Sequence, residues 1–365
     1  MYTSFHIQNF RGFQDFKMEK LARINLIAGQ NNVGKTALLE ALFLHAGAYN
    51  PALILTLNVL RGVERTKVDV MTPSNPLWDY LFYKINPKAM IRLSGSGSVN
   101  ENRVLELDVV RKPEEISQIR LPRLEVGNEN GNGTPYVTNE NAVKVLRLRH
   151  TQPGQESGAV HLIQTRDGIE SESHPEPPFQ AIFVPSGFRF PPSGDAERYG
   201  ELDRINKQQI VLDVLRLIEP RIVRLSAFPV GGVYVLHGDI GLGELIPVTM
   251  MGEGTNRLLS FILAIASSGG GVVFIDEIES GLHYSVQRAI WKALYKAAVD
   301  FNVQVFSTTH SRECINAAYE AFTEIGEYDF LFHRLVRGES GNVQSITYDQ
   351  IAMQGVKQLE LEVRG

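Results

Sequence analysis

Residues 23–46, RINLIAGQNNVGKTALLEALFLHA, decide the fold. The stretch opens with an apolar run, passes through a glycine-rich loop at residues 29–36 and continues with alanine and leucine at helical spacing. The loop has the pattern G-x-x-x-x-G-K-[ST], in which main-chain N–H groups surround phosphates at the N-terminus of a helix. The stretch therefore predicts a strand, a phosphate-binding loop and a helix in direct succession.

Each residue type in this loop has a chemical role. Lys35 is expected to reach the β- and γ-phosphates of a nucleoside triphosphate, and Thr36 to hold Mg²⁺ through its hydroxyl. A glycine turn with an accidental lysine is the alternative, and the strand before the loop and the helix after it disfavour that alternative. The predicted nucleotide-binding residues are Gly29, Gln30, Asn31, Asn32, Val33, Gly34, Lys35, Thr36 and Ala37.

Further along the chain, GVVFIDEIES at residues 271–280 is an apolar run that ends in two adjacent carboxylates. A buried parallel strand delivers such residues to the carboxyl edge of its sheet. We expect Asp276 to order the magnesium ion, directly or through water, and Glu277 to position and deprotonate the attacking water. The alternative is that the two acids merely end a strand and have no catalytic role. The phosphate-binding loop elsewhere in the chain disfavours this alternative.

Two weaker motifs accompany these. The run VQVFSTTHS, residues 303–311, ends in hydroxyl residues and His310, which can sense a γ-phosphate or hold water, although spacing alone favours a structural histidine. The run MMGEGTNRLLSFILAIA, residues 250–266, places glycines around Glu253 before an amphipathic helix. Such a helix start can hold an anion, and it can equally be a flexible cap.

The remaining patterns predict the overall organisation. Residues 2–8 and 23–28 are expected to be strands joined by a turn segment. Residues 50–180 predict antiparallel strands (RVLELDVV, AVKVLRLRH, AVHLIQT) with loops (SGSGSVNEN, GNENGNGTP), and the proline-rich ESHPEPP predicts an extended linker. One helix is expected over 195–219, with Leu202, Ile205, Leu212 and Leu215 on one face, and strands over 221–248. The last third alternates helix and strand, as in a parallel sheet covered by helices.

Composition sets the class of protein. With 365 residues, 43% of them hydrophobic and 21% charged, the chain is expected to be globular and to form two domains or one domain with an insertion. Cys314 is the only cysteine, which excludes an internal disulfide and fits the reducing cytoplasm. We expect no signal peptide, membrane span or membrane partner. The net charge of −5 argues against general nucleic-acid coating but leaves local contact with nucleic acid open.

Together these motifs resemble the ATPase domain of the OLD family and its relatives, which are akin to RecF and SMC heads. The resemblance rests on FHIQNFRGF, NLIAGQNNVGKTALLEAL, MGEGTNRLL, IDEIESGLHYS and VFSTTHSRECI, within residues 1–48 and about 245–316. It implies an α/β fold of the ABC-type P-loop NTPase head, with a mixed and parallel sheet flanked by helices, an antiparallel β lobe and a helical lobe. It also implies an ATPase core of residues 1–50 and 221–365, with 51–220 as an inserted β-rich and helical region.

The resemblance assigns roles by position. Residues 29–36 correspond to Walker A, Asp276 and Glu277 to Walker B, His310 to the switch histidine and 280–283 to the D-loop. The implied cofactors are ATP and Mg²⁺, bound at the interface of a head-to-tail homodimer or higher oligomer. The implied signature residues, which contact ATP held by the other copy, are Gly252, Glu253, Gly254 and Thr255.

Three departures from the family pattern qualify the function. Gly252 stands where relatives generally carry a serine that touches the γ-phosphate, which favours slow hydrolysis. No Q-loop glutamine is recognisable. Because 55 residues follow His310, we expect the TOPRIM nuclease domain of OLD proteins to be absent. The resemblance thus implies an ATP-driven switch or scaffold that controls a separate effector, a nuclease or toxin, in prokaryotic defence against phage.

Three alternatives stay open at this point. The chain can be a repair or recombination ATPase that binds DNA directly, as RecF and SMC proteins do. It can be a nucleotide-binding interaction module without hydrolysis, which the presence of Glu277 disfavours. It can also be a transporter ATPase subunit, which the RecF-like opening and the string MGEGT disfavour.

Overall fold

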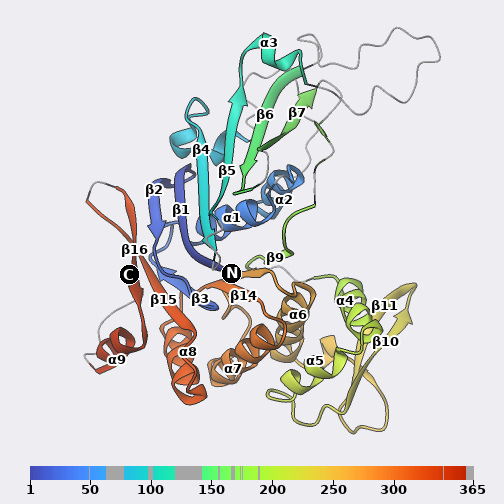
Figure 1. Cartoon of the computed structure of the whole chain (residues 1–365). Coiled ribbons are helices and arrows are strands. Elements are labelled where there is room, and N and C mark those ends of the chain that lie inside the picture. Colours follow the sequence, from blue (N-terminus) through green and yellow to red (C-terminus); the bar gives the residue numbers. More distant parts are fainter. Residues whose placement is uncertain are drawn as a thin grey trace, which may run out of the picture.

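The computed structural model describes residues 1–48, 50–62, 78–97, 102–119, 142–154, 157–165, 169–172, 174, 176–187, 190–339 and 341–358. Two sheets with one helix between them form the centre of the molecule, and further helices cover the outer face of the second sheet (Figure 1). Within the described ranges, we find no helix with the length and apolar character needed to cross a bilayer.

The first sheet is antiparallel throughout, with the strand order β2-β1-β4-β5-β6-β7-β8. The three strands predicted from RVLELDVV, AVKVLRLRH and AVHLIQT are its members β5, β6 and β7, so these predictions are confirmed. The strands are β1 (Tyr2–Phe10), β2 (Phe13–Met18), β4 (Ile91–Gly97), β5 (Asn102–Val110), β6 (Ala142–Thr151), β7 (Gly158–Thr165) and β8 (Ile169–Ser171).

The second sheet is mixed, with the order β16-β15-β3-β14-β13-β9. All neighbouring strands are parallel except β16, which pairs antiparallel at the edge. Every residue of β3, β13 and β14 is buried, as expected for parallel strands covered on both faces. The strands are β3 (Ile24–Gly29), β9 (Ala181–Val184), β13 (Val272–Ile275), β14 (Gln304–Thr308), β15 (Phe330–Arg337) and β16 (Val343–Tyr348).

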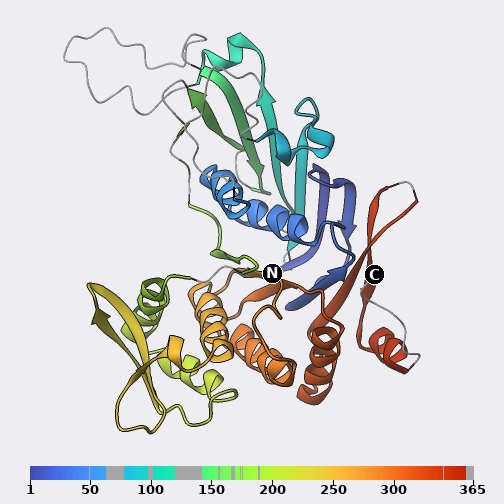
Figure 2. The same cartoon turned by 180° about the vertical axis from the view of Figure 1, so that it is seen from behind.

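Helix α1 (Lys35–Ala46) lies between the two sheets, and nearly all of its residues are buried. This explains why its sequence, TALLEALFLHA, is apolar on every side rather than along one stripe. On the outer face of the six-stranded sheet lie α6 (Glu253–Ser267), α7 (Tyr284–Asp300) and α8 (Arg312–Ile325), as Figure 2 shows from behind. The predicted alternation of helix and strand in the last third is confirmed.

A lobe of helices and short strands follows β9 in the chain. It combines a three-stranded antiparallel sheet, which packs on its first helix, with two helices that pack against α6 (Figure 1). Its elements are α4 (Pro192–Arg204), α5 (Gln208–Leu215), β10 (Arg224–Val230), β11 (Val233–Asp239) and β12 (Ile246–Pro247). The remaining short elements are α2 (Ala52–Leu60), α3 (Pro113–Ile116), α9 (Gln350–Gln358), η1 (Asp79–Leu81), η2 (Tyr83–Ile85) and η4 (Val248–Met250).

Several local predictions were wrong. The expected turn segment between the first two strands contains β2, whose burial alternates because one face packs on the core. The predicted helix 195–219 is two helices, since the chain turns at Asn206 with φ 57° and leaves Ile205 exposed. Helix α2 was not predicted, and β4 runs through the SGSG of an expected loop. The loop predicted for GNENGNGTP lies outside the described residues.

The division into a core of 1–50 and 221–365 with an inserted 51–220 stays a prediction. Strand β9, from the inserted segment, is an edge strand of the six-stranded sheet. Strand β1, from the core segment, pairs with β4 of the inserted segment. Both sheets are therefore shared between the two parts.

Candidate functional site

The glycine-rich loop joins the end of β3 to the start of α1, as predicted. Its two glycines, Gly29 and Gly34, have positive φ angles of 148° and 117°. A Cβ atom at Gly29 would lie 2.5 Å from the carbonyl oxygen of Leu335, and one at Gly34 would lie 2.8 Å from Cζ of Phe13. Glycine is therefore required at both positions, by backbone conformation and by space.

Lys35 folds back over this loop. Its Nζ donates hydrogen bonds to the carbonyl oxygens of Gly29, at 2.8 Å, and Gln30, at 3.0 Å. Burial lowers the pKa of the Lys35 amine, and the nearby carboxylates of Asp276, Glu277 and Glu279 oppose that shift. The ammonium group is thus held inside the loop by neutral carbonyl oxygens, where phosphate oxygens can replace them as stronger, charged acceptors.

Thr36, in the first turn of α1, lies beside Asp276, which directly follows β13. The Thr36 hydroxyl donates to Oδ2 of Asp276 at 2.9 Å, and the Thr308 hydroxyl donates to Oδ1 at 2.5 Å. A hydroxyl and a carboxylate are hard oxygen ligands of the kind that Mg²⁺ prefers, with phosphate and water completing the octahedron. The Thr36 hydroxyl and the Asp276 carboxylate therefore form the candidate magnesium site. Within the described part of the chain, no cluster of three or more His, Cys, Asp or Glu residues suits a metal ion.

Glu277 follows Asp276 directly and adopts a left-handed backbone conformation, with φ 49°. Its N–H donates to the Thr308 hydroxyl oxygen at 2.8 Å, which fixes the turn after β13. One carboxylate oxygen accepts a hydrogen bond from the Ser186 hydroxyl, and the other lies 3.3 Å from Nε2 of His310. The main-chain N–H of His310 donates to Oε1 of Glu279 at 2.7 Å. The structure therefore brings the predicted base and the predicted switch histidine into contact.

The sequence analysis did not identify Ser186 as a site residue. It follows β9, the edge strand whose four residues AIFV end beside the carboxyl end of β13. The backbone supports this arrangement, because the Asp276 N–H donates to the carbonyl oxygen of Val184 at 2.9 Å. The short apolar run before Pro185 and Ser186 was an available signal, but a four-residue run is too short to identify a core strand.

Most of the candidate site residues line one open cavity. Its walls include residues 31–37 of the loop together with Glu277 and His310. Several cationic side chains in these walls suit a polyanionic ligand. The sequence analysis did not identify the other wall residues, Arg11, Gly12, Asn58, Arg61, Tyr80, Phe82, Lys84, Ile85 and Arg337.

The predicted signature residues lie elsewhere, at the start of α6. Gly252 and Glu253 are exposed, Gly254 is half-buried, and Thr255 is buried. Gly252 has φ 110°, and a Cβ atom there would meet nothing within 4 Å. These residues are not part of the walls described for the loop cavity. Within one chain, the structure thus does not bring the signature residues to the phosphate loop.

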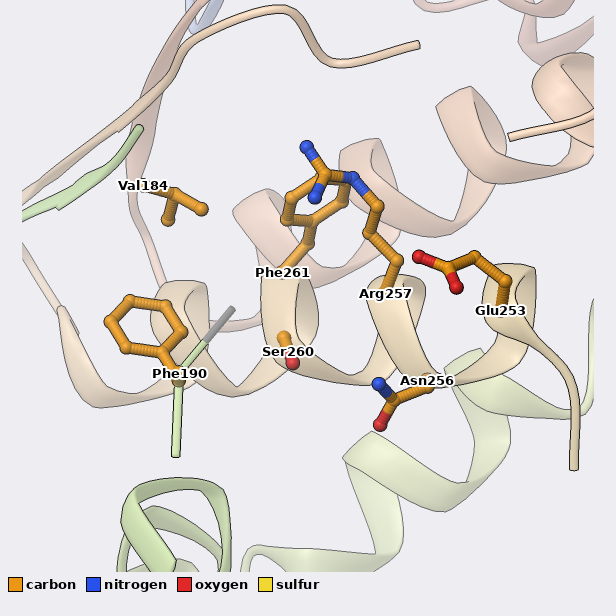
Figure 3. A pocket seen from close by; sticks show the side chains of 7 residues that line it. All are labelled: Val184, Phe190, Glu253, Asn256, Arg257, Ser260 and Phe261. Carbon is orange, nitrogen blue, oxygen red and sulfur yellow. The ribbon is translucent and has the colours of Figure 1, made fainter. Parts of the chain in front are cut away.

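A second, small cavity lies beside α6. Figure 3 shows Glu253, Arg257 and Phe261 on one side of this helix, with the Glu253 carboxylate directed toward Arg257. A Cβ atom at Gly281 would lie 3.1 Å from Oε1 of Glu253. The predicted D-loop and the predicted signature helix are therefore packed together in one chain. The cavity is lined by Val184, Phe190, Glu253, Asn256, Arg257, Ser260 and Phe261.

Comparisons with known proteins place this site in context. The sequence model of the AAA ATPase domain family matches residues 1–109 and 200–315. A protein of Helicobacter pylori described as an ATP/GTP phosphatase is 25% identical over 343 residues, which cover 89% of each chain. An uncharacterized protein of Methanocaldococcus jannaschii is 43% identical over 63 residues, 17% of this chain and 28% of that protein.

A solved structure has a similar fold. It is the SMC head bound to the C-terminal winged-helix domain of ScpA, with a TM-score of 0.50 and 10% sequence identity. The similarity covers 97% of this chain and 99% of that chain. The α/β head fold expected from the sequence is therefore confirmed.

Proposed function

Since the chain belongs to the AAA ATPase domain family and is an ATPase with an SMC-head-like fold, we propose that it binds Mg-ATP on residues 29–37 and hydrolyses it with Glu277 as base. The observation that carries the proposal is the joining of three elements at one sheet edge. Thr36 contacts Asp276, and Glu277 contacts His310, in and beside one cationic cavity.

The proposed chemistry follows from these positions. The N–H groups of the loop and the Lys35 ammonium hold the triphosphate, and Thr36 with Asp276 would hold Mg²⁺, which neutralises phosphate charge. Glu277 accepts a proton from the attacking water, and Ser186 and His310 orient its two carboxylate oxygens. His310 also lines the cavity, so it is placed to contact the γ-phosphate.

Phosphate release and nucleotide binding, measured side by side, test this assignment. Lys35→Ala is expected to lose both nucleotide binding and phosphate release, because the loop then lacks the Lys35 ammonium group. Glu277→Gln is expected to bind ATP normally but to release phosphate at least about 100-fold more slowly, since a positioned base contributes about 10²–10⁴-fold. Glu201→Gln, which changes an exposed acid of α4, is the control. Equal turnover by Glu277→Gln and the native chain would remove Glu277 from the base role.

We further propose that two copies associate head to tail around ATP. The support is that a Cβ atom at Gly252 would meet nothing within 4 Å and one at Gly254 would meet only Leu282, at 4.0 Å. Both glycines lie outside the walls of the phosphate-loop cavity of their own chain. A helix start of this kind attracts an anion. Main-chain N–H groups of Gly252, Glu253, Gly254 and Thr255 would then contact the γ-phosphate held by the second copy, while the Glu253 carboxylate stays directed toward Arg257.

Sedimentation of the Glu277→Gln protein tests the association, because slow hydrolysis preserves the nucleotide-bound state. Dimers are expected with Mg-ATP and monomers without it. Gly254→Glu is expected to abolish the dimer while leaving ATP binding intact, since its carboxylate would face the partner's γ-phosphate. Gly200→Glu is the matched control, a helical glycine of α4 with open space around its Cβ position. Dimers of Gly254→Glu would contradict the proposed interface.

Finally, we propose that this ATP-dependent association acts as a switch for a separate effector, a nuclease or toxin, in prokaryotic defence against phage. The proposal is supported by the OLD-like motifs alone, including MGEGTNRLL and IDEIESGLHYS. Affinity purification from the native host, with mass spectrometry and sequencing of bound nucleic acid, tests it. An effector protein is expected to co-purify. Stable ATP-dependent binding of the purified chain to bare DNA would instead favour a repair or recombination ATPase.

A further inference from the structure

The loop cavity extends beyond its phosphate side to residues 78–85. There Tyr80 and Ile85 line the cavity, and their side chains are 58% and 55% exposed. Lys84 lines the same wall, and its Nζ lies 5.3 Å from the centre of the Tyr83 ring. This wall therefore presents the exposed ring of Tyr80, the aliphatic side chain of Ile85 and the cation of Lys84 beside the proposed phosphate site.

These side chains stand on a firmly anchored segment. Trp78, Leu81 and Phe82 of the same segment are each at most 1% exposed. Asp79 forms an ion pair with Lys144 of β6, and Phe82 forms a β-bridge with Phe10 of β1. The exposure of Tyr80 and Ile85 thus results from a backbone that is fixed by the buried side chains of Trp78, Leu81 and Phe82.

The backbone of this segment is also strained. Lys84 and Ile85 have φ angles of 52° and 53°. A β-branched residue rarely adopts the left-handed conformation, and such strain is typical of ligand-binding segments. The strained backbone places Ile85 in the cavity wall rather than in the core.

The turn between β1 and β2 sets the distance from this wall to the phosphate loop. On one side, a Cβ atom at Gly34 would contact the ring of Phe13. On the other side, the Arg11 N–H donates to the carbonyl oxygen of Leu81 at 2.7 Å. Arg11 and Phe13 are two residues apart, so their Cα atoms are at most about 7.6 Å apart. Residues 31–37 and Tyr80 line the same cavity, so a nucleotide with its phosphates on the loop would have its base directed along the wall that holds Tyr80.

We infer that Tyr80, with Ile85 beside it, forms the base subsite of this ATPase and favours purine nucleoside triphosphates. The inference rests on the proposed placement of the triphosphate on residues 29–37. An aromatic ring stacks on any base, and the larger ring system of a purine gains more from it than a pyrimidine does. The loop would recognise the charge of the phosphates, and the Tyr80 ring would set the preference for the base.

Equilibrium binding of ATP, UTP and inorganic tripolyphosphate tests the inference, because tripolyphosphate has the charge but no base. Tyr80→Ala is expected to weaken ATP binding about tenfold, which corresponds to about 1.4 kcal/mol, and to leave tripolyphosphate binding unchanged. It is also expected to reduce the preference for ATP over UTP. Tyr80→Phe should behave as the native chain, and so should Tyr83→Ala, whose ring is not among the cavity-lining residues.

Two results would overturn the subsite. One is unchanged ATP affinity in Tyr80→Ala. The other is equal weakening of ATP and tripolyphosphate, which would indicate damage to the phosphate loop instead. Failure of the proposed function has a different signature, because a native chain that binds neither ATP nor tripolyphosphate removes the phosphate assignment as well.

Discussion

At the scale of single residues, Thr308 connects the two carboxylates that follow β13. Its hydroxyl donates to Asp276 and accepts from the Glu277 N–H, at 2.5 Å and 2.8 Å. The side chain is fully buried, so water cannot replace either bond. One hydroxyl on β14 thus fixes both the candidate magnesium ligand and the backbone turn of the candidate base.

Replacing this hydroxyl by a methyl group tests its importance. Thr308→Val keeps the shape but leaves a buried carboxylate oxygen and a buried N–H unpaired, which costs on the order of 1–3 kcal/mol. We expect the free energy of unfolding, measured with urea, to fall by about that amount, and phosphate release to slow about tenfold or more. Thr308→Ser keeps the hydroxyl and should retain most activity. Native turnover in Thr308→Val would show that the hydroxyl does not position Glu277.

At the scale of elements, Glu40 of α1 ties three segments together. Its carboxylate, 2% exposed, lies 2.7 Å from Nε of Arg11 in the β1–β2 turn and 2.7 Å from Nε of Arg61 after α2. Burial lowers the pKa of the Arg11 guanidinium, and the Glu40 charge opposes that shift. Since Arg11 and Arg61 both line the loop cavity, Glu40 holds two of its cations in place.

Removing the Glu40 carboxylate should therefore lower the free energy of unfolding. Glu40→Ala leaves Arg11 buried without its counter-charge, and breaking such a buried pair costs about 3–5 kcal/mol. We expect the midpoint of urea unfolding to fall accordingly. Glu201→Ala breaks an exposed pair with Arg204 and should cost no more than about 1 kcal/mol. Similar losses in the two variants would mean that the Glu40 cluster does not stabilise the fold as a buried ion pair.

At the scale of the whole molecule, buried polar contacts fix α1 to the antiparallel sheet. His45 in its last turn bonds to the Tyr2 hydroxyl of β1 at 2.7 Å and to the carbonyl oxygen of Arg103 in β5 at 3.0 Å. Burial lowers the pKa of the His45 imidazole to about 3, and the Arg103 charge adds to that shift. The folded molecule therefore keeps this histidine neutral across the physiological pH range.

This neutrality predicts a pH dependence of stability. The unfolded chain binds a proton at His45 below pH 6.5 while the folded chain does not, so stability is complete above that pH and is lost as pH falls toward 3. Between pH 6 and 5 the free energy of unfolding should fall by up to about 1.4 kcal/mol per pH unit from this residue. His45→Gln should show a shallower slope in urea unfolding. An unchanged slope would contradict a neutral, buried His45.

The sequence by itself determined the elements whose signals are local. The phosphate loop, the buried strands β3, β13 and β14 and the helices α1, α6, α7 and α8 follow from apolar runs, helical spacing and required glycines within one short stretch. The acidic pair Asp276 and Glu277 was identifiable for the same reason. Segments whose conformation depends on partners, such as β2 and the break at Asn206, were predicted wrongly.

Only the tertiary structure decided which distant residues complete the site. Arg11 and Tyr80 reach the cavity through the β1–β2 turn and the strained segment 78–85, and Ser186 reaches the Glu277 carboxylate from the end of the edge strand β9. Their positions depend on sheet pairing and core packing between segments far apart in the chain, which no local pattern records. The candidate phosphate-binding residues were therefore predictable from the sequence, whereas the surroundings of Glu277 and the proposed base subsite required the fold.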